Sequence, residues 1–339
     1  MGTTQILISV VSCRSDQAER EPFCKLVRES AAEEIVFVEA NRAEFIFIVG
    51  ILEANAFENL RKLNVWRAHP EKCFIYCESD NPPSLLHGVC SAMPRWKHRF
   101  GRFQTCGYPL HAKWLPNPPS AGPFGFDSEK RYLMSFLGRR SHSVRRAIFA
   151  RKWPQDIYVH CTNHYRHFDS QGETDHSQRH AFWQILRQSK FALCPRGAGV
   201  SSIRLFDAMS IGVAPVIVSD GWVPPTGPTW TDFALFVNER DIGELEQIVR
   251  AHESEWIRRG RLAYAAYIRY FNESNFWPFI QEAVRNIQRD QSLSERWFVA
   301  LSAIITSIEW GYQAAWAAAL KTWSMLRAIT RLIHWQGRQ

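Results

Sequence analysis

The sequence predicts an α/β protein with two βα-type domains and a helical C-terminal tail. Short apolar runs alternate with helix-like stretches, which is typical of parallel sheets covered by helices. A proline- and glycine-rich tract at residues 113–126 interrupts this alternation, and 339 residues suffice for two cores. Because open parallel sheets bind ligands at the carboxyl ends of their strands, we expect a cleft between the facing domains.

The first domain is expected to cover residues 1–125. Four apolar runs predict its strands, at Ile6–Val11, Ile35–Val38, Phe45–Val49 and Cys73–Tyr76. A helical stretch at residues 56–67 separates the last two strands. The tract KWLPNPPSAGPFGF contains four prolines and two glycines, so we interpret it as the linker.

The second domain is expected to cover residues 126–290, where the alternation resumes. Its predicted strands are Leu133–Leu137, Ile157–His160, Phe191–Cys194, Ala214–Ser219 and Ala234–Val237. Its predicted helices lie at residues 143–152, 176–188, 202–211 and 239–249. Residues 291–339 form the tail, where a capping-box pattern from Ser292 to Glu295 predicts the start of a long helix.

Composition narrows the class of protein and its surroundings. Hydrophobic residues make up 46% and charged residues 22%, as in a folded globular protein. The net charge of +8 favours anionic partners, namely nucleotide phosphates, nucleic acid or anionic lipid. The eight cysteines include no CxxC pair, and the N-terminus lacks the basic start and long apolar stretch of a signal peptide. We therefore expect reduced thiols and a cytoplasmic protein.

The segment from Ser189 to Pro225 has the features of a phosphate-binding turn. A buried strand ends in a turn where Gly197 and Gly199 let the backbone approach a ligand closely. Ser201 or Ser202 is a natural N-cap for the helix that follows. Free amides and the positive end of the helix dipole together bind phosphate.

The helix after this turn adds charged side chains on one face. Ser201, Arg204 and Asp207 are spaced three residues apart. Arg196 and Arg204 flank a phosphate-sized position, and Asp207 is placed to accept hydrogen bonds from ribose hydroxyls. The alternative is a plain surface pair of Arg204 and Asp207 beside an ordinary glycine turn. Spacing leaves both interpretations open.

A family resemblance favours the phosphate site. The segment contains, in order, the matches Cys194-Pro195-Arg196-Gly197, Ser202-Ile203-Arg204, Asp207-Ala208, Gly212, Pro215-Val216-Ile217 and Ser219-Asp220-Gly221-Trp222. This pattern resembles the signature of the exostosin-type glycosyltransferases, glycosyltransferase family 47. The upstream SFLGRR, residues 135–140, also resembles the first strand and loop of the family's donor domain.

The resemblance implies an inverting transferase with two Rossmann-like domains in the GT-B arrangement. The second domain would hold a UDP- or GDP-linked sugar, with Arg196 and Arg204 on the diphosphate and Asp207, in place of a more usual glutamate, on the ribose. Gly138 and Arg139 would lie in the loop that faces the leaving phosphates. The resemblance covers about half of the chain, so it implies a glycan or glycolipid acceptor without identifying it.

Sugar transfer also needs a base for the acceptor hydroxyl. Glu78 and Asp80 follow a predicted strand and are the first candidates, although such acids also cap ordinary turns, and His87 is a third choice. A GT-B site usually works without a metal, so we expect no cofactor besides the donor. His160, His164 and His167 have zinc-like spacing, but a strand end favours solvated loop histidines instead.

The tail suggests a membrane surface. Between Trp297 and Leu320 the sole charge is Glu309, a length that would span a bilayer, but polar residues and Gly311 interrupt it. The last residues, KTWSMLRAITRLIHWQGR, mix cations with Trp, Leu and Ile as interfacial helices do. We expect a surface anchor or a helix packed on the first domain, with a true span ranked third.

Three classes of function are therefore considered. The leading hypothesis is a glycosyltransferase, and the second is a catalytically inactive nucleotide-sugar-binding partner of another transferase. A nucleic-acid-binding protein ranks last, because its expected feature, a basic stripe with interleaved aromatics, occurs in the tail, where membrane binding explains it equally well. We expect no nucleic-acid partner.

Overall fold

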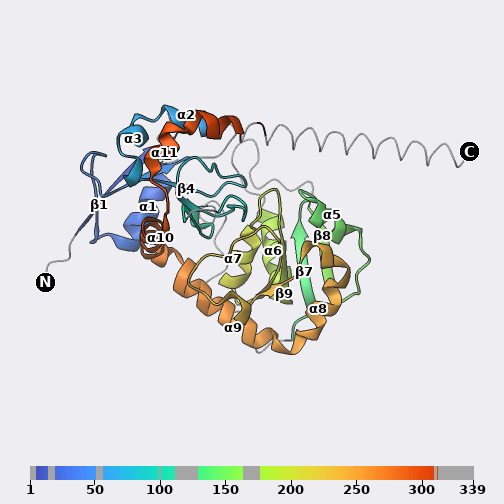
Figure 1. Cartoon of the computed structure of the whole chain (residues 1–339). Helices are drawn as coiled ribbons and strands as arrows, with labels where there is room; N and C mark the ends of the chain where they lie inside the picture. Colours follow the sequence, from blue (N-terminus) through green and yellow to red (C-terminus); the bar gives the residue numbers. More distant parts are fainter. Residues whose placement is uncertain are drawn as a thin grey trace, which may run out of the picture.

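Two parallel sheets organise the chain into two α/β domains (Figure 1). The structure, a computed structural model, describes residues 5–13, 20–50, 56–98, 101–110, 129–162, 176–308 and 311. The first sheet has six strands in the order β2-β1-β3-β4-β5-β6, and the second has five in the order β11-β10-β9-β7-β8. The predicted α/β fold with two parallel-sheet domains is confirmed.

The first domain is a sheet covered by helices on both faces. Its strands are β1 (Ile6–Ser12), β2 (Ile35–Phe37), β3 (Phe45–Val49), β4 (Cys73–Cys77), β5 (Gly88–Cys90) and β6 (Phe103–Thr105). Its helices are α1 (Arg20–Ala31), α2 (Ala56–Lys62), α3 (Asn64–Ala68) and the 3-10 turn η1 (Pro70–Lys72). The sequence did not predict α1, β5 or β6, and the helix expected at residues 56–67 is interrupted at Leu63.

Strand β3 shows why the central strands are apolar on both faces. Phe45 and Phe47 pack in one core cluster with α1, whereas Ile46 and Ile48 pack in a second cluster with Trp66 of α3. Successive strand residues point to opposite sides of the sheet, and both sides are covered. The run therefore reads as continuously hydrophobic.

The second domain repeats this layered arrangement. Its strands are β7 (Tyr132–Gly138), β8 (Ile157–Cys161), β9 (Ser189–Pro195), β10 (Ala214–Val218) and β11 (Leu235–Phe236). Its helices are α5 (Ser143–Ala150), α6 (His176–Arg187), α7 (Ile203–Ser210), α8 (Leu245–Ala251) and α9 (Trp256–Ala266). Short turns complete it, at η2 (Trp230–Asp232), η3 (Glu239–Glu244), η4 (Glu253–Glu255) and the π-helical η5 (Tyr267–Phe271). Clusters on both sides of the sheet join it to α5 and α8 on one face and to α7 and α9 on the other.

The chain returns to the first domain after η5. The turn η6 (Glu273–Asn275) leads into α10 (Phe276–Asp290), which lies beside α1 in Figure 1. Phe276, Trp277 and Ile280 of α10 belong to the core cluster of the first sheet. Helix α10 therefore packs on the first domain, although the sequence boundary at residue 290 assigned it to the second. The sequence analysis predicted no helix at these residues.

The start of the tail also differs from the prediction. Helix α11 (Glu295–Ala300) has Ser294 as its N-cap, whose Oγ accepts a hydrogen bond from the Arg296 amide at 3.3 Å. The expected capping box from Ser292 is therefore wrong, because Glu295 is fully buried and forms an ion pair with Arg102. Residues 302–308 continue as helix. Among the residues that the structure describes, no helix has both the length and the apolarity to cross a membrane.

Candidate functional site

The candidate site lies where the strand order of the second sheet reverses. From β7 the chain goes first to β8 on one side of β7, and then to β9 on its other side. Such a reversal opens a crevice at the carboxyl ends of the two strands, where open α/β sheets bind ligands. Strand β7 ends at Gly138 and β9 at Pro195. The residues expected to bind the donor, Gly138, Arg139 and the turn from Arg196 to Ser202, thus meet at one edge.

The glycines of this turn are required by close approach. A Cβ on Gly197 would lie 3.0 Å from Arg145 Nη2, and a Cβ on Gly199 would lie 2.6 Å from Asp80 Oδ1. Any larger residue would have to displace these neighbours. None of the amides of residues 197–202 donates to a backbone carbonyl within the described part of the chain. They remain available for an anion, as expected at the start of a helix.

The two serines take different positions around the start of α7. Ser202 occupies the N-cap position, but its hydroxyl makes no capping hydrogen bond. Ser201 is buried, 5% exposed, next to Tyr108 of the first domain. Burial raises the pKa of Tyr108, and the nearby Ser201 and Ser91 hydroxyls act in the opposite direction. Ser201 therefore contacts the domain interface rather than capping the helix.

Arg145, which the sequence analysis missed, holds the turn in place. From α5 its Nε donates to the Arg196 carbonyl at 3.0 Å and its Nη2 to the Pro195 carbonyl at 3.1 Å. Burial, with a further contribution from the Arg204 charge, lowers the pKa of Arg145 to about 9, while Asp80 acts in the opposite direction. The one sequence signal was its place in the first turn of the helix after β7, where a long side chain reaches the neighbouring strand.

Arg204 lies against the end of β7. Its Nη2 donates to the Leu137 carbonyl, and its guanidinium lies 4.8 Å from the centre of the Phe136 ring. A Cβ on Gly138 would come within 3.0 Å of Nη2. Burial lowers the pKa of Arg204. Its Nε has no hydrogen-bond partner among the described residues, so one buried N–H group near the end of β7 is unsatisfied. Arg139, next along the loop, is exposed.

Asp207 is already paired. Both of its carboxylate oxygens face Arg179 of α6, at 3.4 and 3.5 Å. The guanidinium of Arg179 also lies 4.7 Å from the Trp183 ring centre. The alternative of an Arg204–Asp207 surface pair is therefore wrong, because Arg179 takes that position. Sequence spacing could not reveal a partner that lies 28 residues away on another helix.

Arg196 is partly exposed at the rim of the turn. Its Nη1 lies 3.7 Å from Glu239 Oε1, and its amide donates to the Val218 carbonyl at 3.0 Å. Glu239 in turn accepts from the Asp220 amide at 3.2 Å. These contacts tie the CPRG turn, residues 194–197, to the DGW turn that follows β10, residues 220–222.

His142 adds a titratable group beside the arginines. It is the N-cap residue of α5, where its Nδ1 accepts from the Val144 amide at 3.3 Å. Burial lowers its pKa to about 4, assisted by the charges of Arg196, Arg146 and Arg145. A neutral imidazole is required for this cap, because a protonated Nδ1 has no free lone pair.

The first domain contributes Asp80 to the site and keeps Glu78 away from it. Asp80 is exposed and its backbone packs directly on Gly199. Glu78 is 7% exposed, and its Oε1 accepts from the Tyr76 hydroxyl at 2.5 Å and the Leu110 amide at 2.8 Å. The carboxylate of Glu78 thus stabilises the loop, while that of Asp80 faces the donor-side turn.

The histidine candidates lie elsewhere. His87 is buried and stacks on Phe74, with 4.2 Å between the ring centres. Its Nδ1 lies 2.8 Å from Gln291 Oε1, so these contacts are to residues outside the turn. His160 is exposed near the end of β8, and His164 and His167 lie outside the described residues. Within the described ranges, no three His, Cys, Asp or Glu side chains are arranged to hold a metal ion. All eight cysteines are described, and none forms a disulfide.

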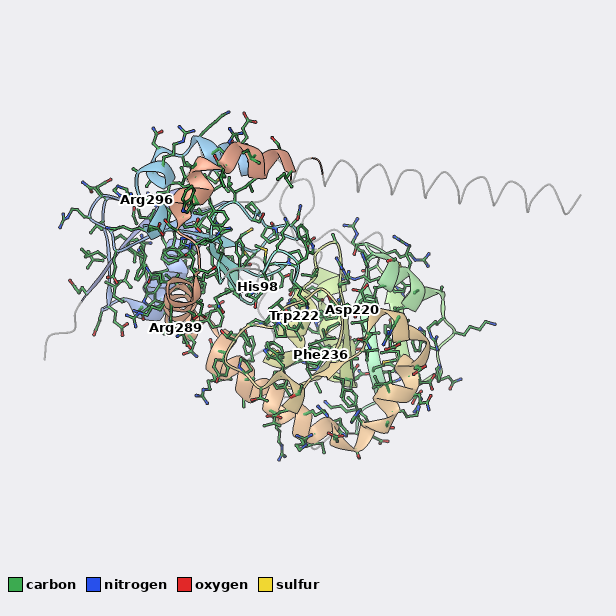
Figure 2. All side chains as sticks on the ribbon, viewed as in Figure 1. His98, Asp220, Trp222, Phe236, Arg289 and Arg296 are labelled. Carbon is green, nitrogen blue, oxygen red and sulfur yellow. The ribbon has the colours of Figure 1, made fainter. Side chains whose placement is uncertain are left out.

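A second contact joins the domains beside the site. The Arg95 amide donates to the Gly221 carbonyl at 2.8 Å, and Arg95 Nη2 to the Trp222 carbonyl at 3.3 Å. Figure 2 shows His98, from the same loop as Arg95, and Trp222 on the facing sides of the two domains. The loop after β5 therefore contacts the turn at residues 220–222.

A family model decides the affiliation of this part of the chain. Residues 109–252 match the model of the Exostosin GT47 domain. The chain carries an exostosin-like GT47 domain. The match includes β7 to β10 and every donor-side residue named above, and the arrangement of two parallel-sheet domains is the GT-B arrangement implied by the resemblance.

Individual relatives agree with this affiliation. The chain is 28% identical over 161 residues to "Exostosin-1 homolog" of Caenorhabditis elegans, covering 42% of each chain. It is 28% identical over 146 residues to "Exostosin-1" of Drosophila melanogaster, covering 39% of this chain and 19% of the relative. A third match, 35% identical over 88 residues, is "Probable glucuronosyltransferase GUT1" of Oryza sativa subsp. japonica, covering 25% and 21%. The chain thus spans less than half the length of these relatives.

Among solved structures, an alpha1,3-fucosyltransferase with GDP resembles the chain at a TM-score of 0.40 and 14% identity, covering 86% of this chain and 92% of that one.

In the GT47 domain described here, the Pro195–Ser202 turn, Arg145 and Arg204 surround the carboxyl ends of β7 and β9.

Proposed function

We propose that the protein is an inverting glycosyltransferase that moves a sugar from a UDP- or GDP-linked donor to a hydroxyl of a glycan or glycolipid. One observation carries the proposal: the free amides of residues 197–202 lie at the switch point of a GT47 domain, in a turn that Arg196 and Arg204 flank in the sequence. Fixed positive charge at this position would stabilise the diphosphate as it leaves.

The donor would bind along the turn. The amides of residues 197–202 and Arg196 would contact the diphosphate, and the exposed Arg139 would approach it from the end of β7. The Nε–H group of Arg204 is buried and has no hydrogen-bond partner among the described residues. This group would complete the anion site. Asp207, held by Arg179, would orient towards a ribose hydroxyl only through the oxygen lone pairs that this ion pair leaves free.

Asp80 would act as the general base. Its carboxylate is exposed, comes from the opposite domain and lies against the donor-side turn at Gly199, which is where an acceptor hydroxyl must approach the sugar. Glu78 is less suited, because its carboxylate already accepts hydrogen bonds from Tyr76 and Leu110. In an inverting reaction the base takes the acceptor proton while the acceptor oxygen displaces the nucleoside diphosphate in a single step, so one carboxylate suffices.

Transfer or hydrolysis of UDP- and GDP-sugars tests the proposal. Arg196→Ala and Asp80→Asn should each lower turnover at least about a hundredfold, the scale lost with an electrostatic or acid–base group. Arg240→Ala is the matched control, because Arg240 is 84% exposed in the same domain. Turnover that is unchanged by a chelator would support metal independence. Wild-type rates in Arg196→Ala would overturn the assignment.

The second candidate function is a nucleotide-sugar-binding partner without activity of its own. It predicts that a donor raises the thermal unfolding midpoint, while no donor is consumed with any acceptor. A ligand at 100 times its dissociation constant stabilises the folded state by about 2.7 kcal/mol, which a thermal shift detects readily. If a donor shifts the wild type but not Arg196→Ala, the donor site stands. If in addition no donor is consumed, Asp80 has no catalytic role.

A further inference from the structure

The helical segment at residues 295–308 has two different faces. Val299 and Ile305 pack against the core of the first domain, and Thr306 is 8% exposed. The opposite face carries four large apolar side chains with exposed fractions of 64%, 44%, 59% and 67%, namely Trp297, Leu301, Ile304 and Ile308. Their spacing of four, three and four residues places them along one side of a helix. We call these four residues the apolar stripe.

A buried ion pair holds this segment so that the apolar stripe faces outwards. Glu295 Oε1 accepts from Arg102 Nε at 2.7 Å, and Oε2 accepts from Arg102 Nη2 at 3.0 Å. The Arg102 guanidinium also lies over the Phe298 ring, 3.3 Å from its centre. Gln291 joins the network through a hydrogen bond to Glu295 Oε1 at 3.0 Å. The orientation of the stripe is therefore set by the packed first domain and not by the helix alone.

The charges around the apolar stripe indicate what covers it. Arg296 is the one charged side chain exposed on residues 295–308, and Figure 2 shows it on α11. In the sequence beyond, residues 309–339 contain the cations Lys321, Arg327, Arg331 and Arg338 but a single acid, Glu309. Tryptophan, leucine and isoleucine alternate with these cations. Apolar and cationic residues in this combination complement a bilayer surface with anionic headgroups.

We propose that the protein docks on anionic lipid bilayers through the apolar stripe of residues 297–308. The stripe is carried by a segment that packs on the first domain, through Val299 and Ile305. This inference goes beyond the proposed sugar transfer and does not depend on it. Its ligand is a lipid surface, whatever the donor turn binds.

Vesicle flotation of the full chain tests the proposal. Ile304→Ser/Ile308→Ser removes two stripe residues that make no core contact, so the fold should be retained. We expect its partitioning onto phosphatidylcholine–phosphatidylserine vesicles to fall at least about tenfold, because each isoleucine loses the gain from leaving water. The matched control is Phe236→Ser/Leu262→Ser, which removes two exposed apolar side chains, 46% and 38% exposed, from the second domain. The control should bind as the wild type does.

Lipid charge and oligomeric state complete the test. Binding should weaken when phosphatidylserine is omitted and when salt is raised, because surface attraction is screened. Flotation of the Ile304→Ser/Ile308→Ser variant at wild-type levels would overturn the proposal, as would a wild type that does not float. A wild-type dimer that this variant converts to a monomer would assign the stripe to a second copy instead. Turnover of a soluble acceptor should not change in either variant, so a failure here is distinguishable from a failure of the proposed function.

Discussion

Asp80 and Gly199 are in direct contact across the two domains: a Cβ on Gly199 would lie 2.6 Å from Asp80 Oδ1 and 2.9 Å from Asp80 Cα. The contact places an exposed carboxylate of the first domain against the glycine turn of the second, residues 196–202. The spacing between the two domains at this point is set by the absence of a side chain on Gly199. If the reaction uses Asp80 together with the turn, its geometry depends on Gly199 even where Gly199 does not contact the substrate.

Gly199→Ala should therefore separate the two domains slightly and lower kcat/KM. Two of the nearest atoms are Asp80 backbone atoms, Cα and O at 2.9 Å, which a rotamer change cannot move. A misplacement of about 1 Å costs up to about a hundredfold in rate. Gly243→Ala is the control, since its Cβ would meet nothing closer than Arg151 Nη1 at 3.9 Å. Steady-state kinetics that are equal for both variants would contradict this role of Gly199.

Arg145→Met should weaken donor binding without removing a group that contacts the donor. The substitution would remove the guanidinium N–H groups that donate to the Pro195 and Arg196 carbonyls. Each carbonyl left without a hydrogen bond costs about 1–3 kcal/mol. We expect a lower unfolding free energy and a higher donor dissociation constant. Arg146→Met, an exposed neighbour on the same helix, controls for the lost charge. Arg145→Lys should regain little of the stability and donor affinity that Arg145→Met loses. One ammonium group cannot donate to both carbonyls with the geometry of a guanidinium. Calorimetry and denaturant unfolding provide the two measurements.

His142 should make stability depend on pH in the acid range. Its pKa is about 4 in the folded protein against 6.5 ordinarily. Below pH 6.5 the unfolded chain takes up a proton that the folded protein refuses until about pH 4. The contribution of this group is therefore complete above pH 6.5 and is lost as the pH falls towards 4. His142→Ser keeps a capping oxygen and removes the titration. Its unfolding midpoint should fall less between pH 7 and pH 5 than that of the wild type, and parallel curves would refute the assignment.

Glu295→Gln should destabilise the first domain strongly. Breaking a buried ion pair leaves an uncompensated charge on Arg102 and costs about 3–5 kcal/mol. Asp156→Asn breaks an exposed pair with Arg250 at a similar distance, 2.9 Å, and should have a much smaller effect. Denaturant titration of both variants tests the difference. If the Arg102→Met/Glu295→Met double variant regains stability, the loss in Glu295→Gln comes from the stranded charge.

The strands that coincide with apolar runs were predictable, the short β2 and β11 included, whereas elements without such a run were not. The run at Phe45–Val49 is β3 residue for residue, and Gly212 has the positive φ of 75° expected after a helix. Strands β5 and β6 have three residues each, too few for a periodic pattern. Helix α1 begins with REPF and carries many charges, so its buried face is evident only when the sheet beneath it is known.

The sequence by itself determined the α/β class, the strands that coincide with apolar runs and the turn from Pro195 to Ser202, because these depend on local hydrophobic pattern and on glycine at positions of close approach. Tertiary structure alone decided which charged groups meet. Arg145 reaches the turn from another helix, Arg179 claims Asp207, and Arg102 claims Glu295. Partners so far apart along the chain are selected by packing, since burial forces each polar group to find whichever counterpart the fold brings within hydrogen-bond distance.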